Sequence, residues 1–448
     1  MDIDALKQAA IDAYMRTEGY SVKDDHYFDY GLGFSAYVGR DGHGTATYPS
    51  MSPYAPPTTT DLDYSGHFST IRSNIDSALE EWQDDKMPTA AQCDAKAVEA
   101  TAAVTALNVG NSTALGGALG GYLKTVSDNA PLFRGETADA FNNSFVNQLP
   151  AVISNHGCLA SLVVEAWGAS KEIWTKARED RDTHVETCTT AFKNYAESGG
   201  PNEVKFVLAL TGAAIAGASA IATGGIALPF TLATVGVTSL SAINDYAAEL
   251  EVERNGANFE ELMDAFVEGL GDIDEGITKQ EQLIADGLEN AWTTFEANRP
   301  LFDLTPRATD DGDGNWNDET SIFDVQDAAG ISFVVPAQEV VDSLSSGMVN
   351  LAHGIGDAAP KVVAGDDTAN VLSDRTVGLQ YSGIAIYMYI LSDNNASSLR
   401  NLQWDVREGN AMYQAVIRDF QDNDTASQTH MDTIRERLSV GSGEDPWA

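Results

Sequence analysis

Apolar residues recur along much of the chain at spacings of three and four, the period that aligns side chains on one face of a helix. The clearest stretch reaches Tyr195, and its Pro150, Gly157 and Gly168 predict kinks or breaks rather than one straight rod. We expect His156 to be a half-buried residue of this stripe. The apolar positions are Phe141, Phe145, Leu149, Val152, His156, Leu159 and Val163, followed by Val185, Cys188, Phe192 and Tyr195.

Other stretches carry the same helical signal. Thr89 and Gln92 match a capping box at the start of an Ala-rich helix that reaches about Leu107. A helical pair is predicted over about 259–270 and 278–298. Two more stripes follow, and the later one is heptad-like. Their members are Val340, Leu344, Met348, Leu351 and Ile355, and then Leu399, Leu402, Val406, Gly409, Tyr413, Val416 and Phe420.

Residues 19–65 lack this period and combine many aromatic residues with Gly, Asp and a Pro56-Pro57 pair. Aromatic side chains at this density are expected to be sheltered, so we predict an irregular arm lying over a helical body. The only candidate strand is Ile331–Val335, between Gly330 and Pro336. The sequence therefore predicts an all-α fold, an elongated bundle of long antiparallel helices with a central apolar helical hairpin.

That hairpin is predicted from Phe206–Asn244, a run of 39 residues without a charged side chain, which we call the uncharged run. Thr223, Gly224, Gly225 and Pro229 divide it, and we expect the turn of the hairpin at Gly224, Gly225 and Pro229. Each half barely reaches the length that crosses a bilayer, and Ala, Gly, Ser and Thr make it weakly apolar. Burial inside a soluble bundle and insertion into a membrane both remain open, since a helix apolar on all sides is either buried or spanning.

The patterns divide the chain into five segments. Residues 1–65 form an N-terminal helix and an aromatic-rich arm, and residues 66–200 form a first helical module. Residues 201–300 hold the apolar hairpin and the helices that follow it. Residues 301–330 are an acidic linker, and residues 331–448 form a second helical module with a loose tail.

The charge balance narrows the classes of partner. Asp and Glu total 67 against 26 Lys and Arg, a net charge of −41. This excess opposes binding to nucleic acid, which requires cationic contacts to phosphate, and binding to anionic lipid headgroups. The acidic first residues, Met1–Lys7, contain no apolar core of a secretory signal peptide, so export would use another route. The cysteines Cys93, Cys158 and Cys188 match no metal-binding spacing, and their disulfide state is left open.

Catalytic motifs are absent from the sequence, so we expect no enzyme activity and no cofactor. The acidic segment 303–320 offers one metal hypothesis, because alternating oxygen donors resemble the first positions of a calcium loop. Trp316 and Ile322 stand where that loop requires Gly and Glu, which favours a solvated acidic linker instead. The candidate calcium ligands are Asp311, Asp313, Asn315 and Asn317.

Phe133-Arg-Gly-Glu-Thr-Ala-Asp-Ala-Phe141 resembles the W-x-G turn of type VII (ESX) secretion substrates, with Phe133 in place of the Trp. Gly135 would permit a tight turn between helices, and an aromatic residue on either side would pin the two arms together. Residues 172–180 and 377–424 also resemble parts of such helical substrates, and the whole is similar to fused PE/PPE-type proteins. Members of that family carry a Tyr-x-x-x-Asp/Glu export element. Tyr14…Glu18, Tyr20…Asp24 and Tyr389…Asp393 match it, and Tyr389 with Asp393 is the preferred site.

The resemblance implies a non-enzymatic helical protein that is secreted or held in the cell envelope without a cleaved signal peptide. It would act through helix-mediated association with other proteins or with copies of itself, and no nucleic acid is expected. The alternative is a membrane-inserting, pore-forming effector or translocator that uses the uncharged run.

Overall fold

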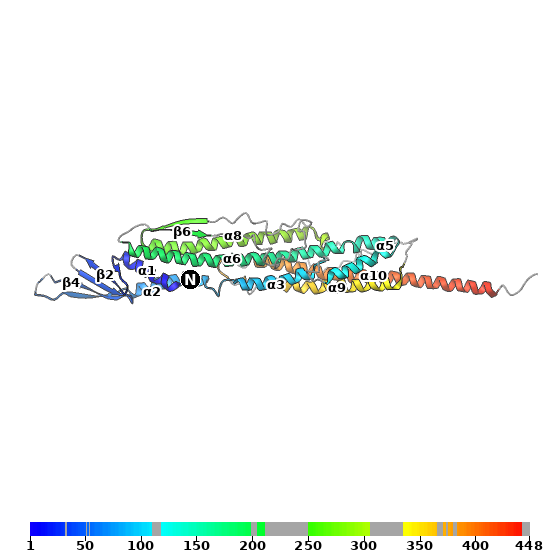
Figure 1. Ribbon diagram of the computed structural model, residues 1–448, viewed down its shortest axis with the longest axis horizontal. Coiled ribbons are helices and arrows are strands. Elements are labelled where there is room, and N and C mark those ends of the chain that lie inside the picture. Colours follow the sequence, from blue (N-terminus) through cyan, green and yellow to red (C-terminus); the bar gives the residue numbers. More distant parts are fainter. Residues whose placement is uncertain are drawn as a thin grey trace, which may run out of the picture.

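The computed structural model describes residues 1–31, 34–50, 52, 54–109, 118–198, 204–210, 250–304, 335–364, 371–372, 375–379 and 383–440. The protein is a long bundle of helices with a small sheet at one end, and its last helix projects past the other end (Figure 1). The predicted helical bundle is confirmed, but the prediction of a purely α-helical chain is wrong.

The main helices are α1 (Ile3–Thr17), α2 (Ser65–Leu79), α3 (Ala90–Ala106), α4 (Leu119–Asn129), α5 (Glu136–Phe141), α6 (Leu149–Glu197), α8 (Phe259–Ala297), α9 (Gln338–Ala364) and α10 (Ile384–Val440). Short helical turns lie at Glu80–Trp82, Ala130–Leu132, Asn142–Val146 and Arg299–Leu301. The strands are β1 (Ser21–Val22), β2 (His26–Gly31), β3 (Phe34–Gly39), β4 (His43–Tyr48), β5 (Thr58–Asp63), β6 (Val204–Leu210) and β7 (Leu250–Gly256).

The predicted irregular arm is instead an antiparallel meander in the order β1-β2-β3-β4-β5. Gly42, at φ +91°, supplies the left-handed residue of the turn between β3 and β4. The strands escaped the sequence analysis because large aromatic residues occupy both faces of β2, which hides the period of two. Tyr27 points inward there, while its neighbours Phe28 and His26 lie on the opposite face.

Polar and apolar contacts attach the inner face of the sheet to α1 and α2. The Tyr27 hydroxyl donates to Asp12 Oδ1 at 2.7 Å, and Arg40 contacts the same two side chains. The Tyr27 ring also meets the Phe68 ring of α2 edge-on, with centroids 5.9 Å apart. The sheet is therefore fixed rigidly to the end of the bundle.

Helix α6 carries the strongest predicted stripe and runs for 49 residues without the breaks expected at Gly157 and Gly168. Both glycines are buried within the bundle. Pro150 lies in the first turn, where the absence of an N–H group costs no hydrogen bond. The real interruption precedes Pro150, at the π-helical turn Asn142–Val146. The helical pair expected after the uncharged run is likewise a single helix, α8, of 39 residues.

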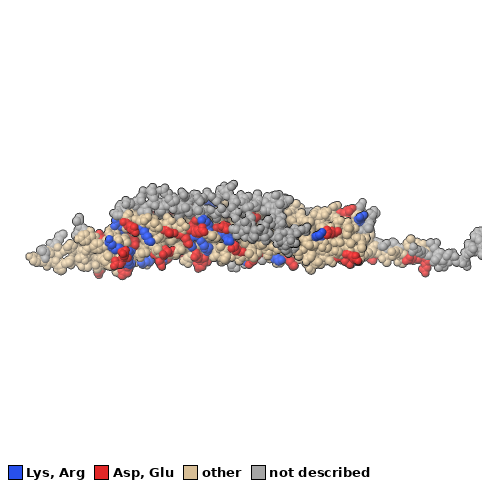
Figure 2. All heavy atoms as spheres, in the orientation of Figure 1, with Lys and Arg blue, Asp and Glu red and all other residues tan. Residues whose placement is uncertain are grey.

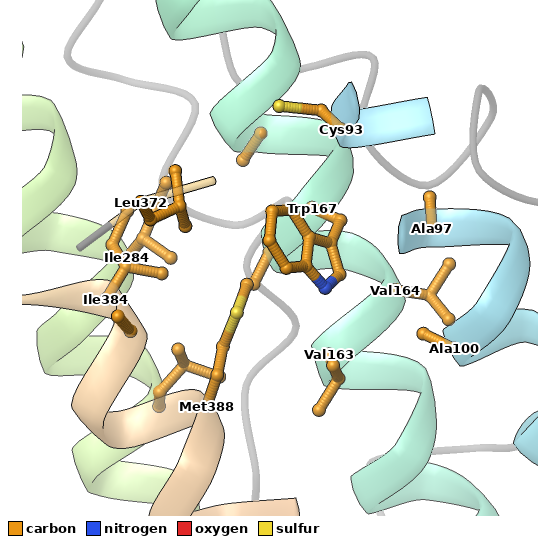
Figure 3. Packing of buried hydrophobic residues seen from close by; sticks show 14 of the residues in the cluster. Cys93, Ala97, Ala100, Val163, Val164, Trp167, Ile284, Leu372, Ile384 and Met388 are labelled. Carbon is orange, nitrogen blue, oxygen red and sulfur yellow. The ribbon is translucent and has the colours of Figure 1, made fainter. Parts of the chain in front are cut away.

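The middle of the core lies between α3, α6, α8 and α10. Figure 3 shows Trp167 of α6 at its centre, with Ala97 and Ala100 of α3 on one side and Ile284 of α8 and Met388 of α10 on the other. Trp167 is fully buried. Small side chains on α3 allow that helix to approach α6 closely, whereas the larger residues of α8 and α10 fill the space opposite.

The two late stripes form α9 and α10, as predicted. Leu344, Met348, Leu351 and Ile355 are completely buried where α9 packs on α10. On α10 the buried stripe runs through Leu399, Leu402, Val406 and Tyr413 and then shifts to Ile417. Beyond Phe420 every side chain that the structure describes is exposed, so this part of α10 has left the bundle.

The start of the uncharged run contradicts the predicted helical hairpin, because Phe206–Leu210 belongs to strand β6 and pairs with β7. A run of small and β-branched residues fits a strand and a helix equally well by composition. Residues 206–210 form a strand because they pair with β7. Residues 211–249 lie outside the described part of the chain. In that part, a single helical region passes a length and hydropathy test for membrane spanning, Ala138–Glu197, and 83% of its most apolar window is buried.

Candidate functional site

The strand pair β6–β7 joins the two ends of the segment that holds most of the uncharged run. The register is antiparallel and extends from Val204 opposite Gly256 to Leu210 opposite Leu250. The chain therefore enters residues 211–249 and leaves them at adjacent points. Strand β6 lies against α6, and β7 leads directly into α8 (Figure 1).

Asn258 caps the N-terminus of α8 directly after β7. Asn258 Oδ1 accepts a hydrogen bond from the Glu261 N–H at 2.9 Å, and Glu261 in turn accepts from the Ala257 N–H at 2.8 Å. Gly256 is buried at the entry, and a Cβ there would lie 2.5 Å from Leu262 Cδ2. This junction fixes where β7 ends and α8 begins.

Helices α6 and α8 run antiparallel beneath the strand pair. Near the strands, the Phe192 ring of α6 lies 6.2 Å from the Phe259 ring of α8. In the middle of the pair, Trp174 Nε1 donates to Glu281 Oε1 at 3.2 Å. At the far end, His156 Nε2 lies 2.9 Å from the Phe302 carbonyl oxygen, just beyond α8. Contacts along the full length make this helix pair a stiff support for the strands.

Glu281 is the centre of a buried polar junction between α8, α6 and the segment before α10. Its Oε1 accepts from Arg375 Nη1 at 2.5 Å, and its Oε2 accepts from the Leu379 N–H at 2.7 Å. The Arg375 guanidinium also lies over the Trp174 ring, 4.6 Å from its centroid. Burial raises the pKa of the Glu281 carboxyl, and Arg375 and the other donors oppose this rise.

Gly378 shapes the same segment. It adopts φ +79°, and a Cβ there would lie 2.7 Å from Glu281 Oε2. Its N–H donates to Asp274 Oδ1 at 2.5 Å, and Asp274 lies about two turns before Glu281 on α8. Residues 375–379 are therefore clamped onto α8 by side-chain and backbone contacts together.

His156 is fully buried rather than half-buried as predicted. Its Nδ1 lies 2.6 Å from Asn395 Oδ1 of α10, while the Asn395 amide nitrogen donates to the His156 carbonyl at 3.1 Å. The Phe302 carbonyl and Asn395 Oδ1 can both only accept, so each oxygen favours a proton on the ring nitrogen that it faces. Burial lowers the pKa of His156, although the two oxygen neighbours favour the charged ring.

The glycine of the predicted helical turn, Gly135, has a positive φ, which favours glycine over other residues. Gly135 adopts φ +116° as the residue before α5. The two flanking aromatic residues both contact Tyr413 of α10. The Phe133 ring meets Tyr413 edge-on at 4.8 Å, and the Phe141 ring stacks on it at 5.3 Å. The turn thereby joins the start of α5 to the distant helix α10.

The predicted export residues Tyr389 and Asp393 lie one turn apart near the start of α10. Tyr389 is 55% exposed, and Asp393 is partly exposed. Both are accessible on the outside of the bundle, four residues apart on one helical face.

The remaining predicted site residues fall outside the described part of the chain. They are the hairpin-turn residues Gly224, Gly225 and Pro229 and the candidate calcium ligands Asp311, Asp313, Asn315 and Asn317. Within the described ranges, no group of three His, Cys, Asp or Glu side chains could hold a metal ion. Cys93, Cys158 and Cys188 are each buried and free of disulfides, and burial raises the pKa of each thiol to about 12.

Sequence reasoning did not find Trp174, Glu281, Arg375 or Asn395. Glu281 lies on the apolar face of α8, four residues after Ile277 and three before Ile284, so a charge on a buried stripe was the available signal. Arg375 and Asn395 lacked any such pattern. Comparisons of the chain with protein-family models, with curated proteins and with solved structures give no match.

Proposed function

We propose that this protein is a non-enzymatic, membrane-active helical protein that inserts residues of the uncharged run into a lipid bilayer. The observation that carries the proposal is the β6–β7 register, which brings Leu210 and Leu250 opposite each other. A membrane hairpin enters and leaves the bilayer on one side, so its two ends must lie together at the surface. The strand pair meets that requirement, on a stiff support formed by α6 and α8.

The amount of chain between the strands also fits. Two helical spans of the shortest length, about 17 residues each, need about 34 residues in all, and the uncharged residues 211–244 number 34. Charged residues reappear only at Asp245 and Glu249, next to β7. The Ala, Gly and Thr content gives a weakly apolar segment, which suits a chain that must remain soluble in water before it meets a membrane.

The strong negative charge restricts the target membrane. A chain with net charge −41 is repelled by anionic headgroups over about one Debye length. Zwitterionic or neutral bilayers are therefore the expected targets.

Release of a dye from zwitterionic vesicles tests the proposal with the full chain. We expect the wild type to release the dye, and Ala216→Asp and Thr234→Asp to reduce release at least tenfold, because Asp costs about 2.5–3.5 kcal/mol at the centre of a membrane helix. Val98→Asp is the matched control, since Val98 is 68% exposed on α3 and far along the chain from the run. Intact vesicles in the presence of correctly folded wild type would refute this function.

A second function is favoured by a different observation, the exposed end of α10. Met431 is 60% exposed and Ile434 is 40% exposed, three residues apart on a helix without neighbours in the described bundle. We propose on this basis that the protein also associates through helices, with itself or with another protein, after export by a type VII-like route. The Phe133–Phe141 turn and the accessible Tyr389 and Asp393 support such a route.

Export and association have separate tests. Deleting the host's type VII machinery should abolish appearance of the protein in the medium, and Tyr389→Ala with Asp393→Ala should have the same effect. Continued export after the deletion would reject the route. Light scattering at low and high salt measures assembly directly, and a monomer under both conditions would reject self-association.

A further inference from the structure

We propose that the outer face of the N-terminal sheet binds a neutral polysaccharide. The pairing registers divide the sheet into two faces. Tyr27, Ala36, Val38 and Ala46 lie on the inner face and are buried against the helices. The alternate residues point the other way, to solvent, at the end of the molecule that projects past the bundle (Figure 1).

Aromatic rings occupy the part of the outer face formed by β2 and β3. The His26 ring stacks on Tyr37 at 4.6 Å, and the Phe28 ring stacks on Tyr30 at 6.2 Å. His26 and Phe28 meet edge-on at 6.5 Å, which links the two pairs into one strip. Tyr30 is 80% exposed and Tyr37 is 45% exposed, so the strip is open to a ligand.

Hydroxyl groups and the carboxylate of Asp61 occupy the neighbouring part of the same face, on β4 and β5. In one cross-strand row, Tyr37 lies opposite Thr45, which lies opposite Asp61. In the next row, Ser35 lies opposite Thr47, which lies opposite Thr59. The face therefore sets flat rings beside groups that donate and accept hydrogen bonds, the two kinds of contact that sugar rings use.

The charge of the molecule favours a neutral sugar polymer over other occupants. Figure 2 shows charged atoms gathered over the helical body, while the projecting sheet end is largely uncharged on the face in view. The net charge of −41 opposes binding to a nucleic acid or an anionic membrane. A neutral polymer rich in hydroxyl groups is not repelled by this charge.

Size and rigidity agree with this assignment. From His26 to Tyr30 the strand spans roughly 14 Å at about 3.4 Å per residue, the length of a short oligosaccharide. On the inner face, Tyr27 between Asp12 and Arg40 holds β2 and β3 to α1. The rings are therefore fixed before a ligand arrives, which lowers the entropic cost of binding.

The experiment measures depletion of the full-length protein from solution by cellulose and by chitin, both uncharged, and retardation in gels that contain soluble mannan. We expect saturable binding to at least one of these. Tyr30→Ala and Tyr37→Ala should each weaken it about tenfold. Tyr54→Ala is the matched control, because Tyr54 is 96% exposed but lies in the loop between β4 and β5. Thermal unfolding of each variant verifies the fold.

Binding to none of the three polysaccharides overturns the proposal, and so does binding that Tyr30→Ala and Tyr37→Ala leave unchanged. Phosphatidylcholine vesicles are tested alongside. Vesicle binding that depends on the same two tyrosines, without polysaccharide binding, identifies a lipid surface as the occupant and also overturns it. The proposal does not rest on the membrane activity of the uncharged run, because dye release is measured on vesicles that carry no sugar.

Discussion

Arg375 is one of the few charged residues buried in the described core. It is 8% exposed and neutralises Glu281, which is completely buried. The pair joins α8 to the segment before α10 and is bordered by Trp174. Polar groups at this depth stabilise the fold only as a complete set, because each loses its hydration on burial.

Replacing Arg375 by Ala should therefore destabilise the protein by about 3–5 kcal/mol, because the Glu281 carboxylate would stay buried without its counter-charge. Denaturant unfolding measures the change. Arg418→Ala, at an exposed position of α10, is the matched control and should change stability by less than about 0.5 kcal/mol. Equal effects of the two substitutions would contradict the role assigned to Arg375.

His156 predicts a pH dependence. Because burial lowers its pKa below the ordinary value of about 6.5, the unfolded chain binds a proton that the folded chain does not as the pH falls below that value. The stability that the neutral ring contributes is present above pH 6.5 and is lost toward acid. Asn395 and the Phe302 carbonyl face the ring, and Asp303 is the charged group that acts on it.

Melting temperatures at pH 7.5 and pH 5.0 test this. The fall between the two pH values should be smaller in His156→Gln than in the wild type, although His156→Gln is less stable at pH 7.5. An equal fall in both proteins would show that the acid sensitivity comes from other groups.

At the scale of elements, α8 shows that packing against a neighbouring helix can outweigh the low helix propensity of glycine. Gly269 faces His184 of α6, and a Cβ there would lie 2.2 Å from the ring. The His184 ring cannot retreat easily, since its Nε2 lies 2.8 Å from the Phe266 carbonyl and it stacks on the Phe266 ring. Gly271, two residues on, has no atom within 4 Å of the same built position.

Alanine at these two positions should have opposite effects. Gly269→Ala should destabilise the protein by about 1–3 kcal/mol through overpacking, whereas Gly271→Ala should stabilise it by about 0.5–1 kcal/mol through helix propensity. Denaturant midpoints of the two variants provide the measurement. Stabilisation by both substitutions would mean that α8 and α6 are not in close contact at His184.

The helices also show which structural features could be predicted from the sequence. Sequence patterns were sufficient where the residues that determine a helix end or a buried face lie within that helix. Thr89 and Gln92 form the predicted capping box at the start of α3, and the stripe from Leu344 to Ile355 is buried as predicted. Breaks were predicted wrongly at Gly157 and Gly168 because a glycine can serve close helix packing as well as flexibility, and only the neighbouring helix decides which.

The sheet and the buried polar junction required information from outside their own segments. Strands β2 to β4 depend on pairing across turns and on a surface, supplied by α1 and α2, that buries one face. Glu281 and Arg375 are 94 positions apart, so neither residue's neighbours in sequence reveal the partner. The turn at Gly135 was recognisable locally, but its contact with Tyr413 was not.

At the scale of the whole molecule, repulsion between like charges opposes the folded state. The chain carries a net charge of −41 on a narrow body, where the acidic side chains lie closer together than in the unfolded chain. Salt shortens the Debye length from about 30 Å at 0.01 M to about 3 Å at 1 M, which relieves this repulsion more than it weakens scattered surface ion pairs.

The melting temperature should accordingly rise by several degrees between 0.01 M and 1 M NaCl, as calorimetry or circular dichroism can show. Glycerol matched for viscosity, without added ions, controls for general solvent effects. A melting temperature that falls with NaCl would mean that the ion pairs of the bundle outweigh the repulsion.

The length of α10 has a practical consequence for anyone who purifies this protein. Its 57 residues extend about 85 Å at 1.5 Å per residue, whereas a compact chain of this size has a radius of gyration near 22 Å. Such a rod experiences more hydrodynamic drag than a sphere of equal mass. A single 47.8 kDa chain will elute early from a gel-filtration column calibrated with globular standards, and its elution volume alone would be mistaken for that of a multimer.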